Sequence, residues 1–199
     1  MFTGYLLLDL ETGGLFSESS LLELSLIHLD NDFNITKLPW GDLNELHLKI
    51  KPDDDIYKIH PSAMKVNKID LGEHDKIAIS ESVAKQQLYE YLKIISKEGK
   101  EKPTPVGVNV YYDINKVHTS LLKKPTWDSF VSYRMLDLGS IWRFFILSGL
   151  IPKECKSGLD GMVDYFKIEI KDRHSSKGDT EAYINVMKAL FGLINAKNH

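Results

Sequence analysis

The feature that most constrains the fold is a short apolar segment near the N-terminus that ends in acidic residues. Residues 5–10 are apolar apart from Asp9, and Glu11 follows directly. A run of this length and composition predicts a buried strand in the centre of a sheet, and Gly13-Gly14 ends it. Because residues two apart on a strand point to the same face, Asp9 and Glu11 are expected side by side at the end of that strand.

Two carboxylates this close are unfavourable unless their charge is compensated. At a separation of ~4 Å they repel by roughly 4 kcal/mol at an effective dielectric constant of about 20. A proton or a bound cation removes this cost, and hard oxygen ligands favour Mg²⁺ or Mn²⁺ over zinc. The alternative is an exposed acidic pair at a strand end, which needs no ligand. The apolar residues 6–8 predict burial and therefore favour a metal site.

The rest of the chain predicts a mixed sheet covered by helices. Further strands are expected at 21–29, 45–51, 106–110 and 131–138, and helices at 61–67, between Ser80 and Gly99, and at 113–122, 141–147, 157–166 and 177–193. The first three strands would form an antiparallel meander, and the later alternation of strand and helix implies parallel strands. We therefore expect an α/β fold with a five-stranded mixed sheet, flanked by helices, in a single domain over residues 1–199.

Composition and charge limit the classes of partner. The net charge is −3, whereas a grip on a long nucleic acid usually needs a basic surface, so any contact with nucleic acid is expected to be local. The single cysteine, Cys155, excludes an intrachain disulfide and a cysteine-based zinc site. No secretory signal pattern and no apolar run of membrane-spanning length is found. The sequence predicts a cytoplasmic protein without a membrane partner.

Two later segments carry further polar residues of interest. Asp113 follows the predicted strand at 106–110 and opens a helix, where the alternative is an ordinary helix cap. His174 lies five residues before Asp179, so it falls on a loop if Asp179 is in the first turn of the last helix. A loop histidine with a pKa of about 6.5 suits proton transfer from water near neutrality. The alternative is a surface histidine without a role.

Together the three segments resemble the three motifs of the DEDDh, or DnaQ-like, family of 3′–5′ exonucleases. That family carries Asp-x-Glu-Thr, then Asn-x-x-aromatic-Asp, then His-x-x-x-x-Asp. This sequence has Asp9-Leu10-Glu11-Thr12, Asn109-Val110-Tyr111-Tyr112-Asp113, and His174 with Asp179. Asp137 and Leu159 resemble residues between the second and third motifs, so the resemblance covers nearly the whole chain. Departures from the usual residues leave the five core positions intact; they are Val108, Lys116, Ser176 and Lys177.

The resemblance implies an RNase H-like fold and metal-dependent hydrolysis of phosphodiesters. Asp9, Glu11 and Asp179 would hold the first of two divalent ions, Mg²⁺ or Mn²⁺, and Asp113 would complete the site of the second, to which Asp9 bridges. His174 would act as the general base, and the product would be a nucleoside 5′-monophosphate.

The resemblance also predicts which residues surround the terminal nucleotide of the substrate. Glycine in the loop after the first motif permits close approach of the backbone, and Phe16 is a candidate for stacking on a base. Packing in the core is the alternative for Phe16, and helix packing for Met64. The predicted substrate-binding residues are Thr12, Gly13, Gly14, Leu15, Phe16, Asn109, His60 and Met64. Lys171, Arg173 and Lys177 surround the histidine loop, where the substrate backbone would pass. The alternative is a scatter of solvated basic residues without a role.

The expected substrate is the 3′ end of single-stranded nucleic acid, with DNA favoured and an exoribonuclease of oligoribonuclease or RNase T type as the alternative. The family implies a homodimer and a polymerase or repair protein as partners to consider. Trp40, Trp127 and Phe130 would form the dimer interface or belong to the core. Two other classes stay open: a non-catalytic module that binds nucleic acid, and an unrelated domain without metal, which Mn²⁺ would not stabilise.

Overall fold

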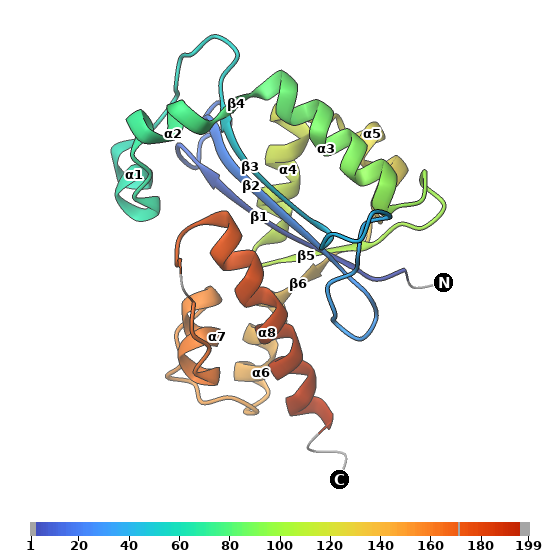
Figure 1. Ribbon diagram of the computed structural model, residues 1–199. Helices are drawn as coiled ribbons and strands as arrows, with labels where there is room; N and C mark the ends of the chain where they lie inside the picture. The colour runs from blue at the N-terminus through green and yellow to red at the C-terminus, as the bar shows by residue number, and fades with distance from the viewer. Residues whose placement is uncertain (1–2, 171, 196–199) are drawn as a thin grey trace.

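A mixed sheet of six strands runs through the structure, a computed structural model that describes residues 3–170 and 172–195 (Figure 1). The first three strands form the antiparallel meander that the sequence predicts, and the remaining pairs are parallel. In spatial order the strands are β4 (Ile79–Ser80), β3 (Glu45–Lys51), β2 (Leu21–Leu29), β1 (Tyr5–Thr12), β5 (Thr104–Gly107) and β6 (Leu136–Asp137).

The mixed α/β architecture is confirmed, with differences at the edges of the sheet. The short strand β4 adds a sixth strand beside β3, which the sequence did not indicate because only two residues pair. The strand predicted at 106–110 ends at Gly107, since Asn109 adopts a left-handed conformation that starts the next helix. Of the strand predicted at 131–138 only Leu136–Asp137 pairs with β5.

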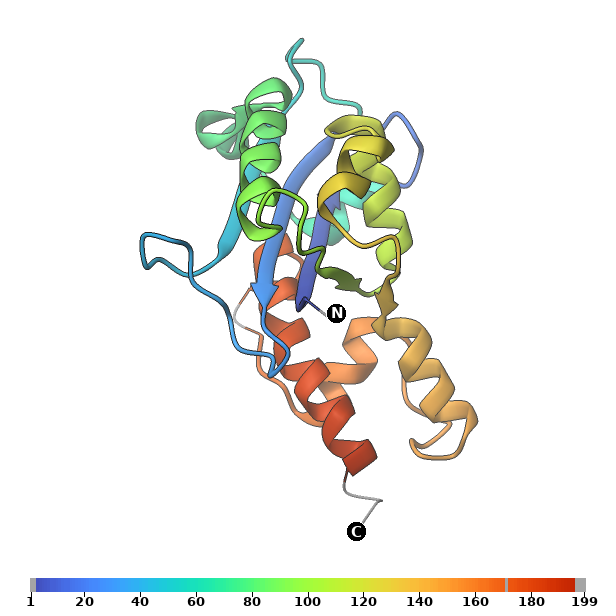
Figure 2. The ribbon, with the colours of Figure 1, turned by 90° about the vertical axis from the view of Figure 1, so that its right-hand side faces the viewer.

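Two layers of helices cover the sheet, as Figures 1 and 2 show. One face carries α3 (Glu81–Ile95), α4 (Val110–Ser120) and α5 (Lys124–Phe130), and the other carries α6 (Leu138–Leu147), α7 (Gly158–Phe166) and α8 (Ser176–Asn195). The short helices α1 (Pro61–Asn67) and α2 (Leu71–Ile77) lie near the end of β1. Helices α2 and α5 were not predicted, because each spans only seven residues and offers little periodicity.

Each face of the sheet has its own hydrophobic core, and the alternation of side chains along β1 separates them. Leu6, Leu8 and Leu10 belong to the core under α3, α4 and α5, whereas Tyr5 and Leu7 belong to the core under α6, α7 and α8. Asp9 and Glu11 point to the same face of the sheet as Tyr5 and Leu7. The fold therefore directs both carboxylates toward the side of the sheet that α8 covers.

The aromatic residues considered for a dimer interface divide between core and surface. Trp127 and Phe130 are buried in the core under α3, α4 and α5, so the alternative reading is right for these two. Trp40 is exposed. In the described part of the chain, no helix combines the length and the apolar character that crossing a membrane requires.

Candidate active site

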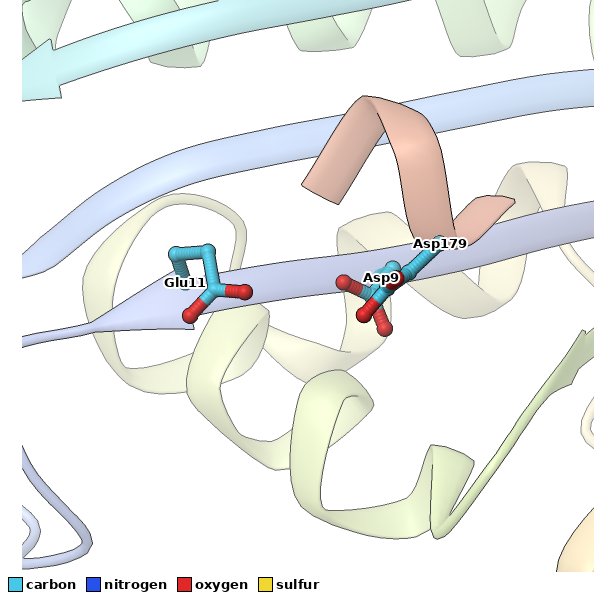
Figure 3. A group of neighbouring side chains, drawn as sticks. All are labelled: Asp9, Glu11 and Asp179. Carbon is cyan, nitrogen blue, oxygen red and sulfur yellow. The ribbon is translucent and has the colours of Figure 1, made fainter. Parts of the chain in front are cut away.

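Three of the predicted metal ligands meet between β1 and α8. One carboxylate oxygen from each of Asp9, Glu11 and Asp179 lies within 4.8 Å of the other two. Figure 3 shows Asp179 reaching from the first turn of α8 to Asp9 on β1, with Glu11 further along the same strand. Asp9 and Asp179 are buried. Two residues of the first strand and one from the last helix thus form a single acidic cluster.

Polar residues of β2 fix the start of α8 and with it the position of Asp179. The backbone N–H and the hydroxyl of Ser176 both donate to Glu23, at 3.3 Å each. The hydroxyls of Thr180 and Ser25 lie 2.5 Å apart. Glu23 and Ser25, together with His28, interrupt the apolar character of this strand in the sequence. The role of Glu23 and Ser25 as anchors for the last helix was not recognised there.

Asp113 approaches the cluster from the other side of β1. It is buried in the first turn of α4, after Asn109, which takes a left-handed conformation with φ 58°. Asp137 holds this turn, because its carboxylate accepts hydrogen bonds from the backbone N–H groups of Val110 (3.0 Å) and Ser140 (2.6 Å). Asp113 is not part of the 4.8 Å group, although it lines the same cleft as Asp9.

The electrostatics of the cluster show an excess of buried negative charge. Burial, followed by the charges of Asp113 and Asp179, raises the pKa of Asp9 well above its usual value. Burial and the neighbouring charge of Asp179 raise the pKa of Glu11 to about 8. Burial also raises the pKa of Asp113 and of Asp179. Glu11 therefore holds a proton near neutrality unless a cation replaces it, and the raised pKa values of the three aspartates show that burial of their negative charge is unfavourable.

The donor set fits a divalent cation. All the side chains of the cluster offer carboxylate oxygens, the hard ligands that Mg²⁺ and Mn²⁺ prefer. Asp179 Oδ1 is buried and has no hydrogen-bond partner among the described residues. A buried anionic oxygen without a partner is costly, and a cation at the centre of the cluster would satisfy it.

Arg173, which was expected along the substrate backbone, instead contacts the acidic cluster. Its Nη1 donates to Asp179 Oδ2, and its Nε and Nη2 donate to Asp160 Oδ1 at 3.0 and 2.7 Å. Lys177 lies on the surface with its ammonium 3.9 Å from Glu181. Lys171 lies outside the described residues. Arg173 is therefore paired with two acidic side chains in this structure and is not directed toward a substrate backbone.

His174 lies on the loop before α8, as predicted, but outside the group of three carboxylates. It is half-buried, its φ is 68°, and it borders a neighbouring groove together with Glu23 and Asn67. This left-handed conformation is uncommon for residues other than glycine, although histidine adopts it more often than most. The structure thus places His174 next to Asp179, where its backbone N–H partly offsets the rise in the pKa of that carboxyl, which burial causes.

A cleft of about 880 Å³ opens beside the cluster and is lined by Asp9, Glu11 and Asp113. Six of the eight predicted substrate-binding residues also line it: Thr12, Gly14, Leu15, Phe16, Asn109 and His60. Phe16 is 40% exposed, so the alternative of core packing is not what the structure shows. Tyr112 and Asn67 line the cleft as well. This volume is in the range of small-molecule and nucleotide sites.

Gly13 and Met64 do not line this cleft. A Cβ on Gly13 would come within 2.4 Å of the carbonyl oxygen of Lys58, so glycine is required there for the close approach of two backbone segments. The backbone N–H of His60 donates to the Gly13 carbonyl at 2.6 Å. Met64 is half-buried in α1. Gly13 therefore serves the close packing of its loop against residues 58–60.

Helix α4 holds the loop that carries Leu15 and Phe16. The Tyr112 hydroxyl donates to the carbonyl of Gly14 at 3.0 Å. One turn further along α4, the buried ammonium of Lys116 donates to the carbonyls of Ser17 (3.2 Å) and Ser19. The departure of Lys116 from the family pattern was visible in the sequence, but its contact with this loop depends on the tertiary fold.

An RNase H-like sheet with four acidic residues on its central strand, α4 and the last helix defines the class of DnaQ-like exonucleases. Comparison with known families agrees: the family model described as Exonuclease, RNase T, matches residues 6–187. The chain belongs to this exonuclease family, which is metal-dependent. The sequence-based assignment to the DEDDh family is thereby confirmed.

Relatives and solved structures are consistent with this assignment. Ribonuclease T of Actinobacillus pleuropneumoniae serotype 5b is 28% identical over 206 residues, which cover 96% of this chain and 88% of that protein. Ribonuclease T of Mannheimia haemolytica is 26% identical, with 96% and 90% covered. E. coli exonuclease I has a similar fold, with a TM-score of 0.72 at 18% identity, over 94% of this chain and 41% of that chain. Cell-death related nuclease 4 gives a TM-score of 0.69 at 13% identity, with 96% and 64% covered. The chain thus spans less than half of exonuclease I.

Proposed function

We propose that this protein is a 3′–5′ exonuclease that removes nucleotides from the 3′ end of single-stranded nucleic acid and releases nucleoside 5′-monophosphates. The observation that carries the proposal is the group of Asp9, Glu11 and Asp179, whose oxygens converge beside a cleft of nucleotide size. Two buried carboxylates and a half-buried one at this distance favour a cation, and a phosphodiester is the substrate whose hydrolysis such a site assists.

Each residue of the site has a proposed role. Asp9, Glu11 and Asp179 would hold one divalent ion, Mg²⁺ or Mn²⁺, and Asp113 with Asp9 would hold a second. When bound, such ions neutralise charge on the phosphodiester and make water a stronger nucleophile. His174, as a neutral imidazole, would accept the proton of the attacking water, because its loop adjoins Asp179 in the chain.

The cleft residues would bind the terminal nucleotide. Exposed Leu15 and Phe16 would contact its base, since aromatic and apolar side chains stack on bases without regard to sequence. The loop that carries them is held by Tyr112 and Lys116. Thr12, Asn109 and His60 line the same cleft and complete the proposed contacts with the nucleotide.

RNA is the substrate that the comparisons favour, in contrast to the DNA expected from the sequence. The relatives that match over nearly the whole chain carry the name ribonuclease T. DNA remains the second candidate, because E. coli exonuclease I, which shares the fold, has been solved in complex with a dT13 oligonucleotide. The single domain over residues 1–199, the homodimer, the cytoplasmic location and the polymerase or repair partner stay predictions.

The test is degradation of 5′-labelled single-stranded RNA and DNA of one sequence, with Mg²⁺, with Mn²⁺ and with EDTA. We expect a ladder that shortens from the 3′ end in the presence of metal, and faster degradation of RNA. Faster degradation of DNA would favour the second candidate. An Asp9→Asn variant controls for contaminating nucleases. If neither polymer is cleaved although Mn²⁺ binds, the non-catalytic module is the better description.

A further inference from the structure

One oxygen of Asp9 is held by a residue outside the acidic cluster. The hydroxyl of Tyr183 donates to Asp9 Oδ1 at 2.5 Å, and both side chains are buried. Asp9 Oδ2 accepts no hydrogen bond from any residue that the structure describes, and Asp9 lines the cleft. The carboxylate therefore has one oxygen fixed and one oxygen available.

The position of Tyr183 follows from the geometry of α8. It lies four residues after Asp179, which is about one helical turn, so both side chains leave the same face of the helix toward β1. Asp179 contributes a carboxylate to the cluster, and Tyr183 reaches past it to Asp9. The aromatic ring of Tyr183 packs in the core under α6, α7 and α8. The hydroxyl is thus delivered by a rigid element with little freedom to move.

Asp179 shows a related division of its two oxygens. Arg173 donates to Oδ2, while Oδ1 is buried without a partner in the described part of the chain. Both aspartates therefore keep one oxygen for a neighbouring donor and leave the other unused. Such outer donors commonly orient the ligands of a metal, and their loss lowers metal affinity.

We propose that Tyr183 is a positioning residue that fixes Asp9 through Oδ1 and so leaves Oδ2 to bind the divalent ion. This inference rests on the proposed function of the site. A carboxylate that rotates freely loses that freedom when it binds a cation, whereas one already held in place loses less. None of the motifs that define the family in the sequence includes Tyr183.

The competing explanation is that Tyr183 only fills the core and that its hydroxyl takes the nearest acceptor. Tyr91 provides a matched control for this explanation. It is a buried tyrosine on α3 whose hydroxyl donates to the carbonyl of Asn44 at 3.0 Å, in the core on the opposite face of the sheet. Tyr91→Phe removes a comparable hydrogen bond far from the acidic cluster.

The experiment measures Mn²⁺ binding by calorimetry, and nuclease activity against Mg²⁺ concentration, for wild type, Tyr183→Phe and Tyr91→Phe. We expect the Kd for Mn²⁺ and the half-saturating Mg²⁺ concentration to rise about 10–100-fold in Tyr183→Phe alone, the usual effect of losing such a donor. At saturating Mg²⁺ the rate should return to within a few-fold of wild type, which damage to the fold would not allow.

Unchanged Mn²⁺ affinity in Tyr183→Phe would overturn the proposal. If wild type cleaves neither RNA nor DNA but Tyr183→Phe still weakens Mn²⁺ binding, the proposed function fails and the role of Tyr183 stands. If Tyr183→Phe does not fold, Tyr183→Met serves instead, because methionine adapts to irregular core space without a hydroxyl. Wild-type Mn²⁺ affinity in that variant would equally refute the role.

Discussion

Replacing Glu11 by glutamine should change how the stability of the metal-free protein depends on pH. In the folded protein, burial and the charge of Asp179 raise the pKa of Glu11 from 4.5 to about 8. The folded state therefore keeps a proton that the unfolded chain releases, and the free energy of unfolding falls as the pH rises from 4.5 to about 8. Glutamine is neutral throughout and removes this contribution.

The magnitude follows from the interval between the two pKa values. Since each tenfold change in proton affinity is worth about 1.4 kcal/mol, the upper limit of the loss is about 5 kcal/mol. Glu11 is half-buried and borders the cleft, so screening by water lowers the expected loss to roughly 2–3 kcal/mol. The difference in stability between Glu11→Gln and wild type should increase by that amount from pH 5 to pH 9.

Urea denaturation in EDTA at pH 5, 7 and 9 measures this difference directly. Glu90→Gln, on the exposed side of α3, serves as the control and should follow the wild-type curve. Addition of Mn²⁺ in excess over EDTA at pH 9 should restore the stability that the wild-type protein has lost, because metal binding requires the ionised carboxylates. Parallel stability curves for wild type and Glu11→Gln would refute the argument that crowded buried carboxylates destabilise the metal-free fold.

Three further predictions concern activity. Asp9→Asn should abolish hydrolysis, because an amide no longer neutralises a bound cation. Circular dichroism should show an intact fold, because the amide oxygen still accepts a hydrogen bond from Tyr183. Full activity in this variant would exclude the site. His174→Ala should lower kcat by roughly 10²–10⁴-fold with oligonucleotide affinity preserved in a fluorescence anisotropy titration, and an unchanged kcat would exclude it as the general base. In Lys116→Met the loop at residues 13–20 loses its hydrogen bonds to the ammonium, so its hydrogen exchange should become faster. The KM for an oligonucleotide should rise more than kcat falls. Unchanged hydrogen exchange would contradict this prediction.

The pattern along β1 allowed the central part of the site to be predicted from the sequence. An apolar run ending in Asp9 and Glu11 determines both burial and the common face of the two carboxylates. The prediction that Asp179 joins these two residues depended on the family resemblance. Asp179 lies far from Asp9 and Glu11 in the sequence, so no local pattern connects them. The structure brings these three together, while Asp113 stays next to them.

The remainder depended on tertiary contacts that the sequence does not encode locally. From its charge and its place near His174, Arg173 was expected close to the substrate backbone. In the structure it instead forms ion pairs with Asp160 on α7 and Asp179 on α8. Tyr183 is one of several apolar or aromatic residues on α8, and nothing in its neighbours distinguishes its hydroxyl. The helix at Lys124–Phe130 was missed because two apolar residues one turn apart do not establish a period.

The acidic cluster joins the first strand of the chain to its last helix, and this order has a consequence for how the site forms. β1 can pair with β2 early, because the two are close in sequence, but Asp179 arrives only when α8 docks onto the completed sheet. Partly folded chains would therefore lack the cluster. During refolding, the return of Mn²⁺ binding would mark the docking of the last helix, and it would lag behind the recovery of strand structure.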